Sequence, residues 1–282
     1  MARVRVVTDS TSDLPPALIK EWDITVVPLL IHFGSETYLD RVNINEEQFF
    51  ARLTTSPVLP TTSPPSVKAF QDVYAKLSQT TDAILSVHIS SKLSATYAAA
   101  VAAREALTNR CRIVIVDSTL TSMALGFMAL NAAKAAAAGE SLDDIAEQVR
   151  GMIPQTHILF FVDTLDYLQK GGRMGKAQAL VNNMLNVKPL LRLEDGEIQP
   201  VERLRTRAKA LERLYEFVAD FPKIEELAIL YSTTPNEANT LAKRIDPVFP
   251  RQRIQLLPYG PVLGVHVGPG AMAVVVYEGE EL

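Results

Sequence analysis

Short runs of β-branched and aliphatic residues alternate with helical patterns through the first half of this 282-residue chain, and this alternation constrains the fold most strongly. The strand-like runs occupy residues 3–7, 24–31, 83–87 and 112–116, and each precedes a segment with helical spacing. Strands that alternate with helices are typical of a mainly parallel sheet with helices on both faces. The first half is therefore predicted to be a doubly wound α/β domain.

Capping residues mark where the helices of this half should begin and end. Asp13, Asn45, Ser63 and Ser141 each stand before a helical pattern, where a short polar side chain can accept a hydrogen bond from a free backbone N–H. Gly139 is a plausible helix stop, because glycine adopts the left-handed conformation of a C-terminal cap. We expect helices to start after the four polar residues and one helix to end at Gly139.

The second half has six strand-like runs, and two of them form a predicted hairpin. The runs occupy residues 157–162, 187–193, 197–204, 227–232, 253–258 and 272–277. Glu194-Asp195-Gly196 supplies a tight turn, so part of this sheet must be antiparallel. We therefore predict two α/β domains, residues 1–154 with a mainly parallel sheet and residues 155–282 with a mixed sheet and helices, a division that fits usual domain sizes.

Composition excludes several classes of function. The chain has 28 Lys and Arg against 32 Asp and Glu, so a broad basic face for nucleic acid is not expected. Its one cysteine, Cys111, excludes an internal disulfide framework and a cysteine-rich metal site, which suits a reducing compartment. With no signal-like run at its start, the chain is predicted to be cytoplasmic.

The most apolar stretch, residues 123–138, is rich in alanine and is broken by Asn131 and Lys134. It is shorter than the roughly 20 apolar residues of a membrane span. We expect a buried helix there and at most transient contact with a membrane.

Four clusters of hydroxyl residues, at 8–13, 60–66, 86–97 and 116–122, lie beside the predicted strands of the first half. Three follow strand ends, where ligands bind in open α/β sheets. Each cluster alone could simply cap helices and form turns. Together, hydroxyls and free N–H groups of helix starts are suited to an anion, so the clusters indicate a polar but uncharged binding site.

His266 lies in a segment, residues 260–271, that contains four glycines and two prolines. These residues predict an irregular backbone that approaches its neighbours closely and could orient a ligand, although a simple tight loop explains them too. No pair of histidines has the spacing of a zinc motif, and the segment 170–176 lacks the spacing and hydroxyl of a phosphate loop. We predict no metal and no bound cofactor.

Arg205, Lys209 and Arg213 recur every four residues in the predicted helix 205–221, whose apolar stripe includes Ala208. With Arg203 nearby, they form either a solvated face or a docking site for an acidic partner protein.

Seven motifs together resemble one family, the DegV-like proteins. They are VVTDSTSDL (6–14), TTSPPS (61–66), HISSKLSATY (88–97), VDS (116–118), VDTLDYLQKGGRMG (162–175), RLRTRAKAL (203–211) and GVHVGPGA (264–271). Their order implies that residues 3–280 form one unit of this family.

The resemblance implies two α/β domains that hold a long-chain fatty acid such as palmitate, with the tail buried and the carboxylate bound by Thr62, Ser94 and His266. It also implies a non-enzymatic carrier subunit that presents the acid to a separate ATP-dependent fatty acid kinase. Arg173, Arg203, Arg205 and Lys209 are the predicted docking residues. The chain departs from the family pattern at Pro64 and Ala95, beside two of the anchors.

Two alternatives remain open from the sequence. Ser94 and His266 could serve a hydrolase or acyltransferase, although no nucleophile elbow is present. The chain could also be a sensor that binds another small anionic or apolar ligand.

Overall fold

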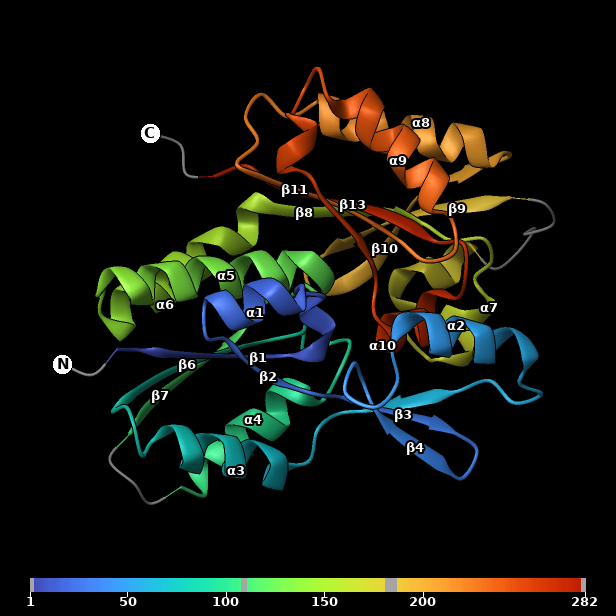
Figure 1. Cartoon of the computed structure of the whole chain (residues 1–282). Coiled ribbons are helices and arrows are strands. Elements are labelled where there is room, and N and C mark those ends of the chain that lie inside the picture. The colour runs from blue at the N-terminus through green and yellow to red at the C-terminus, as the bar shows by residue number, and fades with distance from the viewer. Residues whose placement is uncertain (1–2, 108–110, 181–186, 280–282) are drawn as a thin grey trace.

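Residues 3–107, 111–180 and 187–279 are described by a computed structural model. Within them, three β-sheets and their helices stack into layers (Figure 1). The outer ends of the two predicted domains, residues 1–2 and 280–282, lie outside the described residues, as does the last residue of the predicted family unit.

The first half folds around a four-stranded sheet in which every neighbouring pair of strands is parallel. In sheet order its strands are β2 (Thr25–Val27), β1 (Arg5–Asp9), β6 (Ala83–His88) and β7 (Arg112–Asp117). Its helices are α1 (Pro16–Glu21), α3 (Val67–Leu77), α4 (Thr96–Glu105), α5 (Ser122–Ala138) and α6 (Leu142–Met152). Because α3 and α4 cover one face and α5 and α6 the other, the predicted doubly wound arrangement is confirmed (Figure 1).

The second half forms a six-stranded mixed sheet, also as predicted. In sheet order its strands are β10 (Glu197–Leu204), β9 (Lys188–Glu194), β8 (Thr156–Phe161), β13 (Met272–Tyr277), β11 (Glu226–Tyr231) and β12 (Gln255–Pro258). β11 and β12 are parallel, and the other neighbouring pairs are antiparallel. The predicted hairpin turn joins β9 to β10, with Asp195 and Gly196 both at positive φ as a tight two-residue turn requires.

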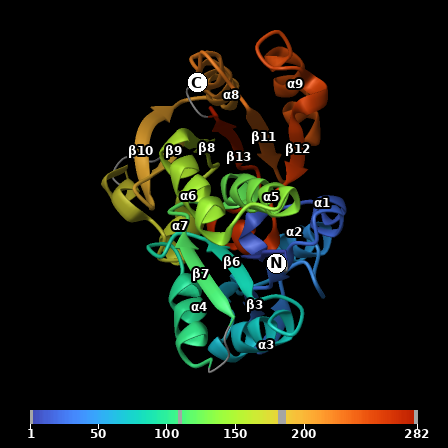
Figure 2. The ribbon, with the colours of Figure 1, turned by 90° about the vertical axis from the view of Figure 1, so that its left-hand side faces the viewer.

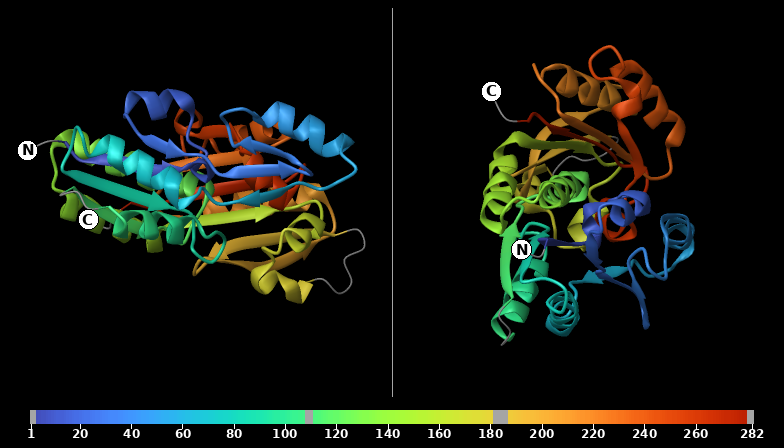
Figure 3. Two further views of the ribbon diagram at one scale, coloured as in Figure 1. Left: turned by 90° about the horizontal axis from the view of Figure 1, so that it is seen from below. Right: turned by 60° about the vertical axis from the view of Figure 1, so that its left-hand side comes forward.

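Helices α8 (Arg207–Ala219) and α9 (Pro235–Ile245) cover the outer face of this mixed sheet. Helix α5 lies between the two large sheets, where it contacts β1 and β6 on one side and β8 and β13 on the other (Figure 2). The same stacking is visible in the right-hand view of Figure 3.

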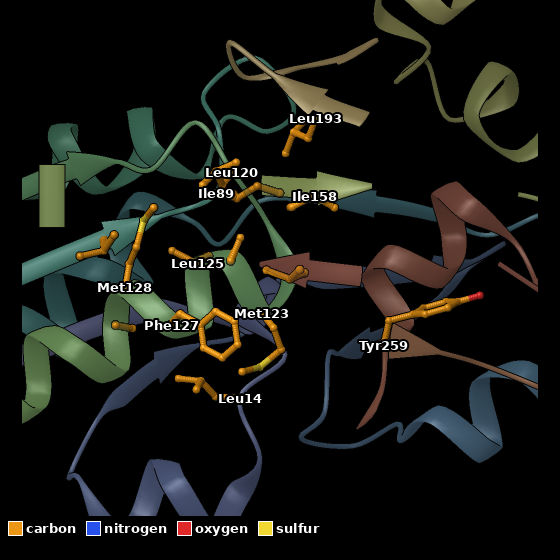
Figure 4. Packing of buried hydrophobic residues seen from close by; sticks show 14 of the residues in the cluster. Leu14, Ile89, Leu120, Met123, Leu125, Phe127, Met128, Ile158, Leu193 and Tyr259 are labelled. Atoms are coloured by element: carbon orange, nitrogen blue, oxygen red, sulfur yellow. The ribbon is translucent and has the colours of Figure 1, made fainter. Parts of the chain in front are cut away.

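Thirteen of the 17 residues of α5 are buried, so the prediction of a buried alanine-rich helix is confirmed. Its alanines and Gly126 let neighbouring segments approach the helix closely. One hydrophobic cluster joins the two halves and includes Leu125 of α5, Ile158 of β8 and Leu193 of β9 (Figure 4). In the described part of the chain, no helix has the length and apolar character needed to cross a membrane.

A third, small sheet was not predicted. It consists, in sheet order, of the antiparallel strands β4 (Glu36–Leu39), β3 (Leu30–Phe33) and β5 (Thr61–Ser63). Helix α2 (Glu46–Thr55) lies between β4 and β5 in the chain. The predicted strand 24–31 is wrong as a single strand, because Pro28 lacks a backbone N–H and separates β2 in the parallel sheet from β3 in this one. The remaining elements are α7 (Asp166–Lys170), α10 (Pro261–Val267), and the 3-10 segments η1 (Ser10–Ser12), η2 (Ile153–Gln155), η3 (Gly175–Leu180) and η4 (Arg251–Arg253).

Two of the predicted helix caps are wrong, and three positions are confirmed. Asn45 forms a complete capping box with its helix, the Ser141 side chain accepts from a backbone N–H, and Gly139 ends α5 in the left-handed conformation. Asp13 does not cap α1, whose N-cap is Pro15. Ser63 belongs to β5, and Ser66 is the cap of α3.

Helix α8 starts later than predicted. Thr206 is its N-cap, so Arg205 precedes the helix and does not share a helical face with Lys209. Ala208 is exposed and Ala210 is buried in its place, because the face that packs on the sheet runs through Ala210, Leu214 and Val218.

Candidate functional site

A pocket between the two halves encloses about 950 Å³ of empty space, part of it open to solvent. Most of its wall is apolar, and side chains of both halves contribute, including Leu29, Ile89, Leu93, Ile158, Phe160 and Leu193. Such a wall favours a largely hydrocarbon ligand.

Polar groups gather on one part of this wall. Thr62 Oγ1 and His266 Nε2 lie 2.8 Å apart although the residues are 204 positions apart in the sequence. Thr62 is the middle residue of β5, where it pairs with Ile31 of β3. His266 lies in the last turn of α10. Contact between β5 and α10 therefore brings the two predicted residues together.

Ser94, the third predicted residue, lines the same pocket just before α4. Its hydroxyl is 2.8 Å from Thr96 Oγ1 and accepts a hydrogen bond from the backbone N–H of Thr96. All three predicted residues thus line the same pocket, and their role toward a carboxylate stays a prediction.

The segment around His266 is not the irregular loop that its glycines predicted, because residues 261–267 form helix α10. The glycines serve close packing of this helix. A Cβ atom at Gly264 would lie 2.5 Å from the Phe49 ring of α2, and one at Gly171, at the end of α7, would lie 2.4 Å from His266 Nδ1. The His266 imidazole is therefore packed between the backbone of Gly171 and the side chain of Thr62.

Burial, together with the positive charge of Arg173, lowers the pKa of His266 to about 4, so the imidazole is neutral near pH 7. Nδ1 is buried and has no partner among the described residues. The tautomer with its proton on Nε2 makes Nδ1 an acceptor, so that no ring N–H is buried without a partner. His266 then donates to Thr62 Oγ1, which leaves the Thr62 hydroxyl hydrogen free for a ligand.

Arg173 also lines the pocket, so the expectation of an uncharged site is wrong. Its Nε donates to the carbonyl of Leu93, next to Ser94, and its Nη1 donates to the carbonyl of Gly171, next to His266. These bonds hold a guanidinium between the two predicted anchors. The sequence signal for this residue is the glycine-rich segment 171–175 around it, and the prediction of a docking role for Arg173 did not place it in the pocket.

The other three predicted docking residues, Arg203, Arg205 and Lys209, are exposed and do not line the pocket. By contrast, the neighbouring Arg207 binds Asp163, Glu237 and the carbonyl of Gly270, so it is a structural residue.

The first hydroxyl cluster, residues 8–13, is buried and lies outside the pocket lining. Asp9 in this cluster accepts hydrogen bonds from Thr11 and from the backbone N–H of Ile89, and it contacts the ring of His88. The expectation that all four clusters form the site is therefore wrong, because this one joins β1 to β6. Tyr259 lines the pocket and was missed. No cluster of three or more His, Cys, Asp or Glu residues suitable for a metal ion occurs among the described residues.

Comparison with known proteins gives matches along nearly the whole chain. A DegV domain-containing protein of Streptomyces coelicolor is 40% identical over 279 residues, which cover 97% of this chain and 98% of that protein. Protein DegV of Bacillus subtilis is 32% identical over 275 residues, which cover 96% of this chain and 98% of its own length.

Two solved structures have the same fold. A DegV family protein from Thermus thermophilus, described by its fatty acid binding, has a TM-score of 0.90 at 31% identity and matches 98% of this chain and 100% of its own. DegV from Bacillus subtilis, described as a fatty acid binding protein, has a TM-score of 0.88 at 31% identity with the same coverage. A family model described as "Uncharacterised protein, DegV family" matches residues 3–279. This chain therefore belongs to the DegV family.

Proposed function

We propose that this chain binds a long-chain fatty acid, with its tail in the apolar pocket and its carboxylate at Thr62, Ser94 and His266. The observation that carries the proposal is the Thr62–His266 pair, which gives a largely apolar pocket, also lined by Ser94, a hydroxyl donor. The structural relatives from Thermus thermophilus and Bacillus subtilis, both described by fatty acid binding, support it.

The tail supplies most of the affinity. Burying the methylenes of a C16 acid at ~0.8 kcal/mol each releases on the order of 11 kcal/mol before the entropy of immobilisation is subtracted. A hydrogen bond to the charged carboxylate adds only ~1.5–3 kcal/mol. The head-group residues therefore set the orientation of the acid more than its affinity.

Arg173 balances the charge of the bound carboxylate. A carboxylate in a largely apolar wall is strongly disfavoured unless it is paired or hydrogen-bonded. The Arg173 guanidinium donates to the carbonyl of Leu93, next to Ser94 in the chain, and to that of Gly171, which packs against His266. We assign it to the head-group site together with the three predicted residues.

The geometry gives no support to a Ser94–His266 hydrolase. Ser94 Oγ is bonded to Thr96, and His266 Nε2 is bonded to Thr62, so neither bond joins Ser94 to His266 as a nucleophile to its base. Moreover, a histidine with a pKa of about 4 is a weak general base near pH 7.

The proposal includes transfer of the acid to a separate ATP-dependent kinase. A carboxylate oxygen would attack the γ-phosphorus of ATP, with ADP as the leaving group, to give an acyl phosphate. The exposed Arg203, Arg205 and Lys209 would dock an acidic surface of that kinase. An alternative role as a sensor of another ligand would need no such partner.

Native mass spectrometry of the purified protein tests the binding proposal. We expect a co-purified long-chain acid, and delipidated protein should bind palmitate again. Protein that is repeatedly isolated without ligand and has no affinity for palmitate would contradict the proposal. For the kinase, Lys209→Glu should slow acyl phosphate formation without changing palmitate affinity, whereas Lys243→Glu on the exposed face of α9 is the matched control. Equal rates for both variants would exclude docking at Lys209.

A further inference from the structure

Asp13 is a buried carboxylate beside the pocket that the proposed function does not use. Asp13 is 1% exposed, and each of its two carboxylate oxygens accepts a hydrogen bond. Oδ2 accepts from the Ser122 hydroxyl at 2.6 Å. Oδ1 accepts from the backbone N–H of Gly260 at 2.8 Å and lies 3.3 Å from Arg41 Nη2. One side chain thus joins η1 to the first residue of α5, to the N-cap of α10 and to the loop after β4.

We infer that Asp13 is a positioning residue that fixes the start of α10 and thereby holds His266 against Thr62. Gly260 is the N-cap of α10, and His266 lies six residues farther along. At a rise of about 1.5 Å per residue, His266 lies about 9 Å from Gly260 along the helix axis. A change in the tilt of α10 at Gly260 therefore displaces the imidazole at the opposite end of the helix.

The backbone around Asp13 is held in unfavourable conformations. Asp13, Arg41 and Ser122 all have positive φ values, of 53°, 59° and 56°, although none is glycine. Such conformations persist only where neighbouring contacts determine them, and they gather at functional sites. Here Arg41 and Ser122 are both bonded to Asp13, and Ser122 itself lines the pocket.

Close packing transmits this position along α10. A Cβ atom at Gly260 would lie 3.0 Å from both Asp13 Oδ1 and Arg41 Nε. Arg41 also donates to the carbonyl of Pro258, which precedes the helix. At the far end, the Tyr259 hydroxyl donates to the carbonyl of Gly268. The helix is therefore held at its start by the Asp13 contacts and at its end near His266.

The inference is tested by NMR titration of the His266 imidazole, assigned with His266→Gln, in Asp13→Ala and Asp13→Asn. In Asp13→Ala we expect the pKa of His266 to rise from about 4 toward its ordinary value of 6.5, because a released α10 admits water. The binding preference for palmitate over hexadecanol should fall about tenfold. Asp13→Asn should restore most of both properties, since the amide can still accept from Gly260 and pair with Ser122.

The matched control is Thr156→Ala. Thr156 is also buried, but its hydroxyl donates to the carbonyl of Met152, and it belongs to β8 and not to η1 or α10. This variant should lower the melting temperature and leave the His266 titration unchanged. If Asp13→Ala only lowers the melting temperature, or if Thr156→Ala shifts the pKa of His266 equally, Asp13 is merely structural.

Should Asp13→Ala fail to fold, Ser122→Ala removes one of its three contacts and should shift His266 in the same direction, and no shift would overturn the inference. The inference rests on the proposed function only for the ligand readout. Wild-type protein that binds no palmitate would contradict that function, while the His266 titration would still decide the role of Asp13.

Discussion

Replacing Thr62 by valine tests the contribution of the head group to ligand affinity separately from that of the tail. Valine has nearly the shape of threonine and favours strands, so β5 and its pairing with Ile31 should persist. The change removes the hydroxyl that lies 2.8 Å from His266 Nε2 and leaves the apolar wall intact.

The expected loss follows from that single group. A hydrogen bond to a charged carboxylate is worth ~1.5–3 kcal/mol, which corresponds to a rise in Kd of about 10- to 150-fold for palmitate. Hexadecanol has the same tail and an uncharged head, so it should lose only a neutral hydrogen bond, and its Kd should rise about 2- to 10-fold. The contribution of ~0.8 kcal/mol per buried methylene is common to both ligands and should not change.

Isothermal titration calorimetry of delipidated protein with both ligands measures these losses. Thr61→Val is the matched control, because Thr61 is the exposed neighbour on β5 and does not line the pocket. Equal losses for the acid and the alcohol, or no loss at all, would refute the assignment of Thr62 to the carboxylate.

Three further variants test the packing and protonation of the site. Gly171→Ala would place a Cβ 2.4 Å from His266 Nδ1, so palmitate affinity should fall by ~1–3 kcal/mol in calorimetry, whereas Gly151→Ala, with nothing within 4 Å, should leave it unchanged. The lowered pKa of His266, about 4 against 6.5, means that the unfolded chain takes up a proton first as the pH falls. As the pH falls from 6.5 to 4, the free energy of unfolding should therefore decrease by at most ~3 kcal/mol more in wild type than in His266→Gln. An equal decrease of the urea midpoint in the two proteins over this range would contradict this expectation. Burial raises the pKa of Asp40 from 3.8 to about 7, so the folded chain holds this proton longer and loses stability as the pH rises through that window. Asp40→Asn should accordingly be more stable than wild type near pH 8 and similar near pH 4, and a gain of equal size at both pH values would exclude this cause.

Much of the fold follows from local sequence patterns. The β-branched runs predicted the parallel sheet, and the turn at Asp195-Gly196 predicted the β9–β10 hairpin, because both signals depend on neighbouring residues only. The break at Pro28 and the short strands β4 and β5 were missed. Strands of three or four residues gain their stability from partners distant in sequence, which no local pattern reveals.

The same distinction holds for the candidate site, because the local sequence revealed its residue types but not their arrangement. Its residue types were visible in the sequence as the hydroxyls at Thr62 and Ser94 and the glycine-framed His266, and the family motifs added their roles as a prediction. The sequence alone did not reveal that Arg173 belongs to the pocket wall, that residues 8–13 do not, or that His266 is on a helix.

The sequence by itself determined the main strands of the two large sheets, the β9–β10 hairpin, the buried character of α5 and the chemistry available for a site. Only the tertiary structure decided which of those groups meet, because Thr62 and His266 are brought together by β5 packing on α10 across 204 residues of chain. It also decided their protonation. The pKa of His266 is lowered by burial and by Arg173, and both depend on groups that the fold, not the local sequence, places beside the ring.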